Sequence, residues 1–203
     1  MNKQEKFWAG AFGNQYINRN IDDKIVSSNI ALFSRILSRT NKINSILEFG
    51  SNIGLNLVAI HTLKKDVEIS AIEINQKAVE FIKENFDFIN CYHSSVFDFH
   101  ADYQRDLVFT KGLLIHIHPE NLEKMYSALY ESSNKYICLI EYYDPNPKEI
   151  EYRGENGVLW KRDFAGEIMK KYPSLELIDY GFIYHGDNQF PADDLTWFLM
   201  KKC

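Results

Sequence analysis

A short apolar run that turns through two glycines into a helical pattern limits the possible folds more than any other feature of this sequence. Residues 43–49 predict a buried strand, and the apolar positions of residues 53–63 recur at helical spacing. Gly50 permits a tight turn with no side chain beneath a ligand, and Gly54 permits close packing of the helix on the strand. We therefore expect a βα unit whose loop presents free backbone N–H groups to a bound molecule.

The rest of the chain alternates predicted strands with predicted helices. The strands are expected at residues 67–74, 88–92, 106–110 and 135–142, and the helices at residues 22–39, 75–86, 119–130 and 162–171. Such alternation indicates βαβ units in a doubly wound, Rossmann-like α/β fold with a mostly parallel sheet. Two further strand-like runs, at residues 175–184 and 195–201, are joined by a turn-rich segment and predict a C-terminal antiparallel strand pair.

The 203 residues, 45% of them hydrophobic and 25% charged, have the length and balance of one globular domain. We expect residues 1–42 to form an N-terminal cap of helices, because an aromatic stretch precedes the amphipathic pattern of residues 22–39. Residues 144–165 open with Asp-Pro-Asn-Pro, and each proline restricts its own φ and the residue before it. This segment is therefore expected to be an irregular substrate loop or lid.

Charge and hydropathy exclude several classes of partner. The net charge of −5 argues against binding of duplex nucleic acid, which needs clustered lysine and arginine. No uncharged stretch approaches the ~18–20 residues that span a bilayer, and the first residues lack an apolar segment. We expect a cytoplasmic monomer or homodimer that contacts neither nucleic acid nor membrane.

Glu73 completes the pattern of a nucleoside site. It follows Gly50 by 23 residues, at the end of a predicted strand, where a carboxylate accepts hydrogen bonds from both hydroxyls of a ribose. A dinucleotide such as NAD also needs glycine in the middle of the loop, where its pyrophosphate approaches, but Asn52 stands there and Glu48 precedes the turn. S-adenosylmethionine (SAM) has no phosphate and carries an ammonium group, so these residues favour SAM over NAD.

Three segments together resemble the class I SAM-dependent methyltransferases. They are E-x-G-x-N-x-G at 48–54, A-I-E-I-N at 71–75 and D-L-V-F-T-K-G-L-L-I-H-I at 106–117, and the resemblance covers about residues 43–142. It implies that the first segment surrounds the methionine part of SAM through Glu48, Gly50, Ser51, Asn52 and Gly54. It further implies that Glu73 and Ile74 hold the ribose and adenine, that Ser95 and Val96 occupy the stretch of the adenine contact, and that Lys111 touches SAM.

A more specific resemblance extends over nearly the whole chain. The segments F-W-x-G-x-F-G-x-x-Y-I-x-R-N at 7–20, E-Y-Y-D-P-N-P-x-E-I-x-Y-R-G at 141–154 and Y-H-G-D-N-x-F-P-x-D-D-x-T-W-F-L at 184–199 are similar to the methylases associated with pseudaminic acid biosynthesis. The resemblance implies methyl transfer to an O or N of a nonulosonic acid of the pseudaminic or legionaminic type, free or nucleotide-activated. Such acidic nine-carbon sugars belong to bacterial surface glycans and flagellin glycosylation.

Cationic residues in irregular or element-edge segments fit an acidic sugar, because guanidinium groups grip a carboxylate or phosphate in bidentate fashion. The candidates for substrate binding are Arg19, Tyr143, Tyr152, Arg153, Lys161, Arg162 and His185. Arg153 is the leading candidate, and the alternative for each cation is a solvated surface charge.

Trp8 and Tyr16 are expected to contribute to the cofactor site, because aromatic faces attract a sulfonium cation. Their alternative role is core packing against the first long helix. Methyl transfer also needs a group that accepts the acceptor's proton, and the candidates at the ends of the fourth and fifth strands are His116, Glu141 and Tyr142. For His116 a structural or SAM-shielding role remains open.

No metal is expected, because the pair His116 and His118 with Glu120 is a weak ligand pattern and the acidic ligand set of metal-dependent O-methyltransferases has no counterpart after residues 106–110. Three alternative functions remain. One is a SAM-dependent methyltransferase for another small acidic metabolite or sugar nucleotide. Another is a non-catalytic SAM-binding partner of a glycan pathway. The third is a nicotinamide oxidoreductase, which Asn52 in the glycine loop opposes.

Overall fold

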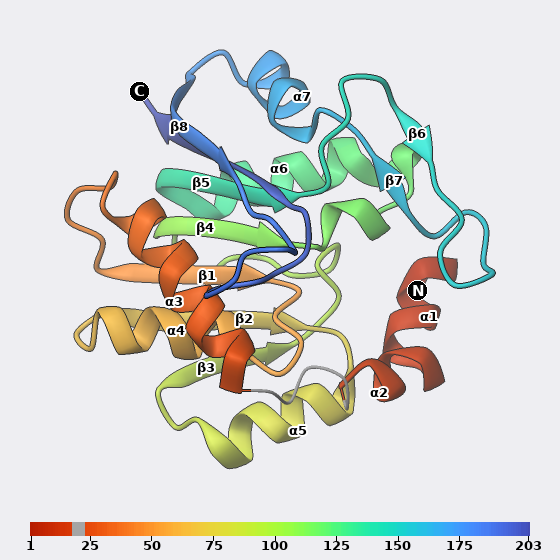
Figure 1. Cartoon of the computed structure of the whole chain (residues 1–203), viewed down its shortest axis with the longest axis horizontal. Helices are drawn as coiled ribbons and strands as arrows, with labels where there is room; N and C mark the ends of the chain where they lie inside the picture. Colours follow the sequence, from red (N-terminus) through yellow and green to blue (C-terminus); the bar gives the residue numbers. More distant parts are fainter. Residues whose placement is uncertain (18–22) are drawn as a thin grey trace.

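The computed structural model describes residues 1–17 and 23–203, and it is built around one sheet of seven strands (Figure 1). The strands are β1 Ser45–Phe49, β2 Glu68–Glu73, β3 Ile89–His93, β4 Arg105–Lys111, β5 Ser133–Glu141, β8 Leu175–Phe182 and β9 Thr196–Lys202. Their order across the sheet is β3-β2-β1-β4-β5-β9-β8. The first five strands are parallel, whereas β9 is antiparallel to both β5 and β8. The predicted fold class and the closing antiparallel pair are confirmed.

Helices cover both faces of the sheet, and the sheet separates two apolar cores. One face carries α3 Asp23–Leu37, α4 Leu55–Leu63 and α5 Gln76–Asn85, and the other carries α6 Leu122–Ser132 and α7 Phe164–Lys171. The central parallel strands β1, β4 and β5 are buried on both sides, which explains why they are largely apolar runs instead of alternating patterns.

Local capping chemistry sets several helix boundaries. The Asn75 side chain accepts hydrogen bonds from the N–H groups of Lys77 and Ala78, as its predicted N-cap position requires. Asp163 accepts from the N–H of Gly166 and starts α7 at Phe164, two residues later than the sequence pattern predicts. The helix predicted over residues 119–130 begins as a 3-10 turn, η2 Pro119–Asn121, before α6.

The N-terminal residues form two short helices, α1 Lys3–Ala9 and α2 Ala11–Ile17, which lie away from α3 in Figure 1. Residues 144–165 contain a small antiparallel pair, β6 Lys148–Glu149 with β7 Trp160–Lys161, which the proline-based prediction of an irregular segment did not include. The pair forms because Leu159 and Trp160 are buried and tie the end of the segment to the body of the protein.

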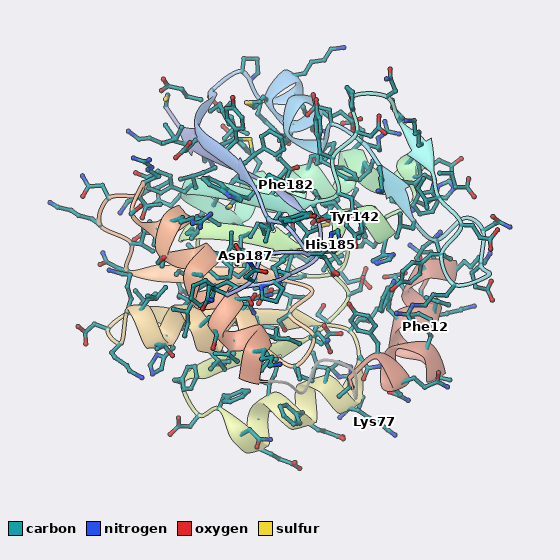
Figure 2. All side chains as sticks on the ribbon, viewed as in Figure 1. Phe12, Lys77, Tyr142, Phe182, His185 and Asp187 are labelled. Atoms are coloured by element: carbon teal, nitrogen blue, oxygen red, sulfur yellow. The ribbon has the colours of Figure 1, made fainter. Side chains whose placement is uncertain are left out.

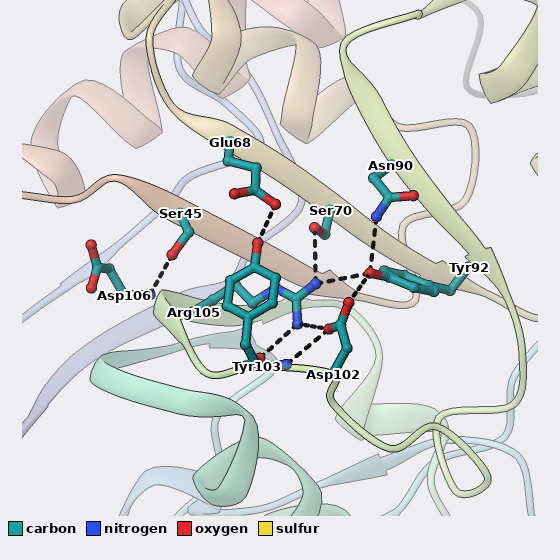
Figure 3. A network of polar contacts seen from close by, with 9 residues as sticks. All are labelled: Ser45, Glu68, Ser70, Asn90, Tyr92, Asp102, Tyr103, Arg105 and Asp106. Atoms are coloured by element: carbon teal, nitrogen blue, oxygen red, sulfur yellow. Dashed lines mark hydrogen bonds and ion pairs between the residues drawn. The ribbon is translucent and has the colours of Figure 1, made fainter.

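A network of polar side chains lies at the amino end of the sheet, where β4 starts (Figure 3). The Arg105 side chain is fully buried there, pairs with Asp102, donates to the Tyr92 hydroxyl at 3.0 Å and lies 3.7 Å from the centre of the Tyr103 ring. These contacts pair a buried charge at the amino end of the central strands, although no described residue hydrogen-bonds the Arg105 Nε. Open α/β sheets bind their ligands at the opposite end, outside the carboxyl ends of the parallel strands.

None of the described helices combines the length and the apolar character needed to cross a membrane.

Candidate functional site

A cavity of about 510 Å³ opens where the carboxyl ends of β1, β2 and β4 meet. The strand order reverses between β1 and β4, and ligands of open α/β sheets bind in the crevice at that point. The sheet supplies the floor, α1 and α2 supply one wall, and residues 185–195 supply another. Tyr142 and His185, which Figure 2 labels, line this cavity from different parts of the chain.

The structure brings together most of the residues predicted for the cofactor. Those that line the cavity are Trp8, Tyr16, Gly50, Ser51, Asn52, Glu73, Ile74, Ser95, Val96 and Lys111. Glu48 and Gly54 lie behind this lining.

The loop between β1 and α4 depends on left-handed backbone conformations. Gly50 has φ +72°, and a Cβ built there would lie 2.8 Å from Leu113 Cδ1. At Gly54, with φ +80°, a Cβ would lie 3.2 Å from Ile89 Cδ1, so this glycine serves helix packing as expected. Asn52 also has a positive φ, +48°, which asparagine tolerates better than most residues.

The expectation of free N–H groups in this loop is wrong for four residues. The N–H groups of Gly50 and Ser51 donate to the Ile72 carbonyl, that of Gly54 donates to Ser51, and that of Asn52 donates to Glu73. The Glu73 side chain, the Ile72 carbonyl of β2 and a carbonyl of the loop itself accept the hydrogen bonds that a phosphate would need. The loop is thus shaped for close approach of a ligand without forming an anion cradle.

Glu73 is held rigidly at the end of β2. Its Oε2 accepts from the Asn52 N–H and its Oε1 from the Asn75 N–H, both at 2.7 Å. Burial raises the pKa of this carboxyl, and the main-chain hydrogen bonds oppose that rise. Each oxygen retains acceptor capacity toward the cavity, which suits two neighbouring hydroxyls of a ribose.

Glu48 and Lys111 are neighbouring ionisable side chains below the loop, and Glu48 is fully buried. Glu48 Oε1 accepts from Asn56 Nδ2 at 2.6 Å, whereas no described residue hydrogen-bonds Oε2. Burial raises the pKa of Glu48 to about 8. Lys111 Nζ donates to Asn29 Oδ1 at 3.1 Å, and burial lowers the Lys111 pKa while Glu48 opposes that change. Lys111 faces the cavity and Glu48 does not.

Glu141 does not reach the cavity but fixes a loop that does. Its carboxylate accepts from the N–H groups of Leu113 and Leu114 at 3.1 Å and of Ile115 at 3.3 Å. Burial raises its pKa to about 7. It thereby caps the 3-10 turn η1 Leu114–His116, which carries His116 into the cavity wall. Tyr142, the next residue, does line the cavity.

His116 is a neutral imidazole with one defined tautomer. Its Nδ1 lies 2.7 Å from the Val158 carbonyl oxygen, which only accepts, so Nδ1 carries the hydrogen. Burial lowers the pKa of His116 to about 4. The Trp8 and Tyr152 rings lie 4.6 and 5.4 Å from the imidazole, centre to centre.

The N-terminal helices are fastened to both halves of the site. Asn75 Nδ2 donates to the Trp8 carbonyl at 3.0 Å, and the Ser95 hydroxyl donates to Glu5. On the other side, Gln4 Nε2 donates to the Gly157 carbonyl at 3.2 Å. Trp8 borders the cavity and packs against Phe12 on the neighbouring short helix α2, whereas the alternative prediction placed its packing partner on α3.

The predicted substrate residues are only partly gathered. Tyr152 and His185 line the cavity, whereas Tyr143, Arg153, Lys161 and Arg162 do not, and Arg19 lies outside the described residues. Arg162 pairs with Glu167 at 2.8 Å.

The two remaining cations sit against rings of the cavity wall. Lys161 Nζ lies 4.8 Å from the centre of the Tyr142 ring, and Arg153 Cζ lies 5.3 Å from that of Tyr152. They are therefore close to the wall, although they do not form it.

Several cavity residues were missed in the sequence. Gln4 and Glu5 carry no motif that would have indicated a role. Asn29 did give a signal in the sequence, because it is a polar residue among the apolar positions of residues 22–39. In the structure its side chain is 2% exposed, and a buried polar group needs a hydrogen-bond partner. Among the residues that the structure describes, no group of three His, Cys, Asp or Glu side chains is placed to hold a metal ion.

Solved structures with the same architecture are methyltransferases. The plantazolicin methyltransferase BpumL was crystallised with a desmethyl-plantazolicin analog and S-adenosylhomocysteine (SAH). It is 13% identical with a TM-score of 0.68, and the match covers 98% of this chain and 94% of that one. The 1,6-didemethyltoxoflavin-N1-methyltransferase of Burkholderia thailandensis, bound to SAH, is 10% identical with a TM-score of 0.70, and the match covers 94% of this chain and 84% of that one. A SAM-dependent methyltransferase of Clostridium acetobutylicum is 11% identical with a TM-score of 0.65, covering 94% and 97%.

This chain has the class I methyltransferase fold. No family model matches the sequence, and no curated protein matches it significantly. In this fold the cavity lies at the β1–β4 switch point, where open α/β sheets bind their ligands.

Proposed function

We propose that this protein is a SAM-dependent methyltransferase. The observation that carries the proposal is Glu73, whose buried carboxylate is fixed by two main-chain N–H groups beside the glycine loop and faces the cavity. A carboxylate placed in this way recognises the paired hydroxyls of a ribose. SAH accompanies two of the similar structures described above, which supports the same ligand class here.

The charge of the cavity favours SAM over a dinucleotide. Its carboxylates are Glu5, Glu73 and Asp193, and Lys111 is its lysine. A pyrophosphate would meet these acids with the N–H groups of the glycine loop already engaged. SAM brings a sulfonium and an ammonium, which the acids attract.

The residues around the loop also fit the methionine part. The Lys111 ammonium beside Asn29 is suited to a carboxylate, and Trp8 and Tyr16 present aromatic faces to a cationic group. When bound, SAM supplies an electrophilic methyl group. The protein's own task is to align the acceptor and exclude water, for which the wall of His116, Trp8 and Tyr152 is suited.

For the acceptor we propose a small acidic sugar of the nonulosonic acid class, acting through an O or N atom. The support is the sequence resemblance together with Lys161 and Arg153, which lie against the Tyr142 and Tyr152 rings of the cavity wall. From that position the two cations attract an anionic group that extends from the cavity.

Binding measurements test the cofactor separately from the acceptor. We expect SAM and SAH to stabilise the protein in a thermal-shift assay and NAD to leave it unchanged, because a ligand at 100 times its Kd adds roughly 2.7 kcal/mol. A shift with NAD alone would refute the proposal.

Turnover is then tested with labelled SAM and pseudaminic acid, its nucleotide-activated form, or a neutral hexose. We expect transfer to the acidic sugars. Lys161→Ala and Arg153→Ala should raise KM for the acidic acceptor and preserve SAH affinity, whereas Lys170→Ala, an exposed lysine on α7, is the control. SAH binding without transfer to any acceptor would indicate a non-catalytic SAM-binding protein.

A further inference from the structure

His185 and Asp194 form a histidine–carboxylate pair at the border of the cavity. The His185 Nδ1 lies 2.9 Å from Oδ1 and 2.8 Å from Oδ2 of Asp194, and the His185 main-chain N–H donates to the same Oδ1 at 2.9 Å. His185 also lines the cavity. We infer that this pair is the base of the methyl-transfer reaction, with His185 as the catalytic residue and Asp194 as its positioning residue.

The pair defines the tautomer of the imidazole. A carboxylate accepts hydrogen bonds and does not donate them, so Nδ1 carries the ring hydrogen and Nε2 presents its lone pair. Asp194 holds the ring and the main chain of one residue at the same time, which fixes the direction of Nε2. Hydrogen bonds from the His185 main chain and ring lower the Asp194 pKa, so this carboxylate is ionised at neutral pH.

The loop that carries the pair is anchored at several points. The Ser28 hydroxyl on α3 donates to the Pro191 carbonyl at 2.8 Å, and the Ile183 N–H donates to the Leu195 carbonyl at 2.8 Å. Asp187 accepts from the N–H of Phe190 and closes a turn inside the loop. A base needs such fixed placement relative to the acceptor.

His116 borders the same cavity but is less suited to take a proton. Its Nδ1 faces the neutral carbonyl of Val158, and it is enclosed by aromatic rings. A carboxylate stabilises the imidazolium that forms during proton transfer, whereas a carbonyl does so less well. His116 therefore suits the wall of the site and His185 suits proton transfer.

Bulk solvent reaches the His185 side chain. The His185 side chain is 67% exposed, so a proton on Nε2 has a route to bulk water. The groups around the pair are Asp193, the Tyr184 ring at 4.8 Å from the imidazole, and Lys161, which acts on Asp194.

The proposed step rests on the proposed function. The acceptor O or N forms a bond to the methyl carbon as the carbon–sulfur bond breaks, and the electron pair of that bond stays on sulfur. The acceptor proton passes to His185 Nε2, giving an imidazolium beside Asp194. Water then removes this proton and restores the neutral imidazole.

Steady-state kinetics of variants, with pseudaminic acid as acceptor, test the His185–Asp194 pair. His185→Ala should lower kcat about 100-fold or more, the usual contribution of a general base, and bind SAH with unchanged affinity by calorimetry. Added imidazole should restore part of the activity. Asp194→Asn should lower kcat at least ~10-fold, with Asp194→Glu recovering more than Asn. His100→Ala, an exposed histidine away from the cavity, is the control.

Two kinetic results would overturn the inference. One is an unchanged kcat in His185→Ala when the wild type turns over, which leaves the proposed function standing. The other is a raised KM at constant kcat, without imidazole rescue, which indicates substrate grip instead of proton transfer.

A spectroscopic test needs no acceptor and so separates this inference from the proposed function. Multiple-bond ¹H–¹⁵N spectra of the SAH complex, at mildly alkaline pH, should show His185 with its hydrogen on Nδ1, and Asp194→Asn should abolish that preference. A hydrogen on Nε2 in the wild type would refute the dyad even if no acceptor is ever methylated.

Discussion

The main-chain N–H of Asn52 donates to Glu73 Oε2 at 2.7 Å, joining the loop after β1 to the carboxylate at the end of β2. Because Oε1 of the same carboxylate accepts from Asn75, the start of α5 belongs to this unit as well. The loop, the acid and the helix cap are therefore joined through one buried side chain, and we expect changes at Glu73 to affect ligand binding.

Glu73→Gln should weaken SAH binding about 10–100-fold, because a hydrogen bond to a charged group contributes roughly 1.5–3 kcal/mol. The amide also places two donors where one main-chain N–H already points at the side chain. Isothermal titration calorimetry with SAH measures the loss. Glu84→Gln, an exposed acid on α5, should bind SAH like the wild type. Equal affinity in Glu73→Gln would mean that the carboxylate does not contact the ligand.

Gly50→Ala should lower SAH affinity at least ~10-fold. A left-handed alanine costs about 1–2 kcal/mol, and its Cβ would lie 2.8 Å from Leu113 Cδ1, displacing a side chain that lines the cavity. Gly154→Ala is a matched control, since its φ is also positive, +82°, and nothing lies within 4 Å of its Cβ. Both variants should lose stability in urea unfolding, but only Gly50→Ala should lose affinity. A loss of affinity in both would point to a global effect.

The order and type of most elements followed from the sequence because each carries its own local signal. The strands are apolar runs, and Asn75 caps α5 at its predicted place. The β6–β7 pair was not predictable from residues 144–165, because it forms through burial of Leu159 and Trp160 against the body of the protein. Tertiary contacts of this kind leave no periodic pattern.

The parts of the candidate site that lie at the ends of strands could be predicted from the sequence. Glu73 and Gly50 lie at strand ends, and topology brings such ends together. The engagement of the loop N–H groups was not predictable, because it depends on the register of β1 and β2. Arg153, the leading sequence candidate for substrate binding, lies against Tyr152 outside the cavity lining, since loop direction is set by contacts that the sequence does not display.

Trp8 should report ligand binding by fluorescence. It lines the cavity and contacts His116, whereas Trp160 and Trp197 are buried elsewhere. Titration with SAH should change the tryptophan emission of the wild type, and Trp8→Phe should remove most of that change while Trp197→Phe keeps it. An undiminished signal in Trp8→Phe would place the ligand away from the N-terminal helices.

The His116 imidazole should make stability depend on pH in a defined direction. Its pKa in the folded protein is about 4, below the ordinary value of 6.5, because burial disfavours the charged form. Between these values the unfolded chain binds more protons, so this residue lowers the free energy of unfolding as the pH falls from 6.5 toward 4. At about 1.4 kcal/mol per unit of pKa, the loss in the free energy of unfolding approaches 3 kcal/mol between pH 6.5 and pH 4.

A variant that does not titrate tests this dependence on pH. His116→Asn keeps a donor that can reach the Val158 carbonyl but does not titrate. Urea unfolding of both proteins at pH 7 and near pH 4.5 should therefore show the variant less destabilised by acid than the wild type, and equal acid sensitivity would show that His116 is not held neutral in the folded state.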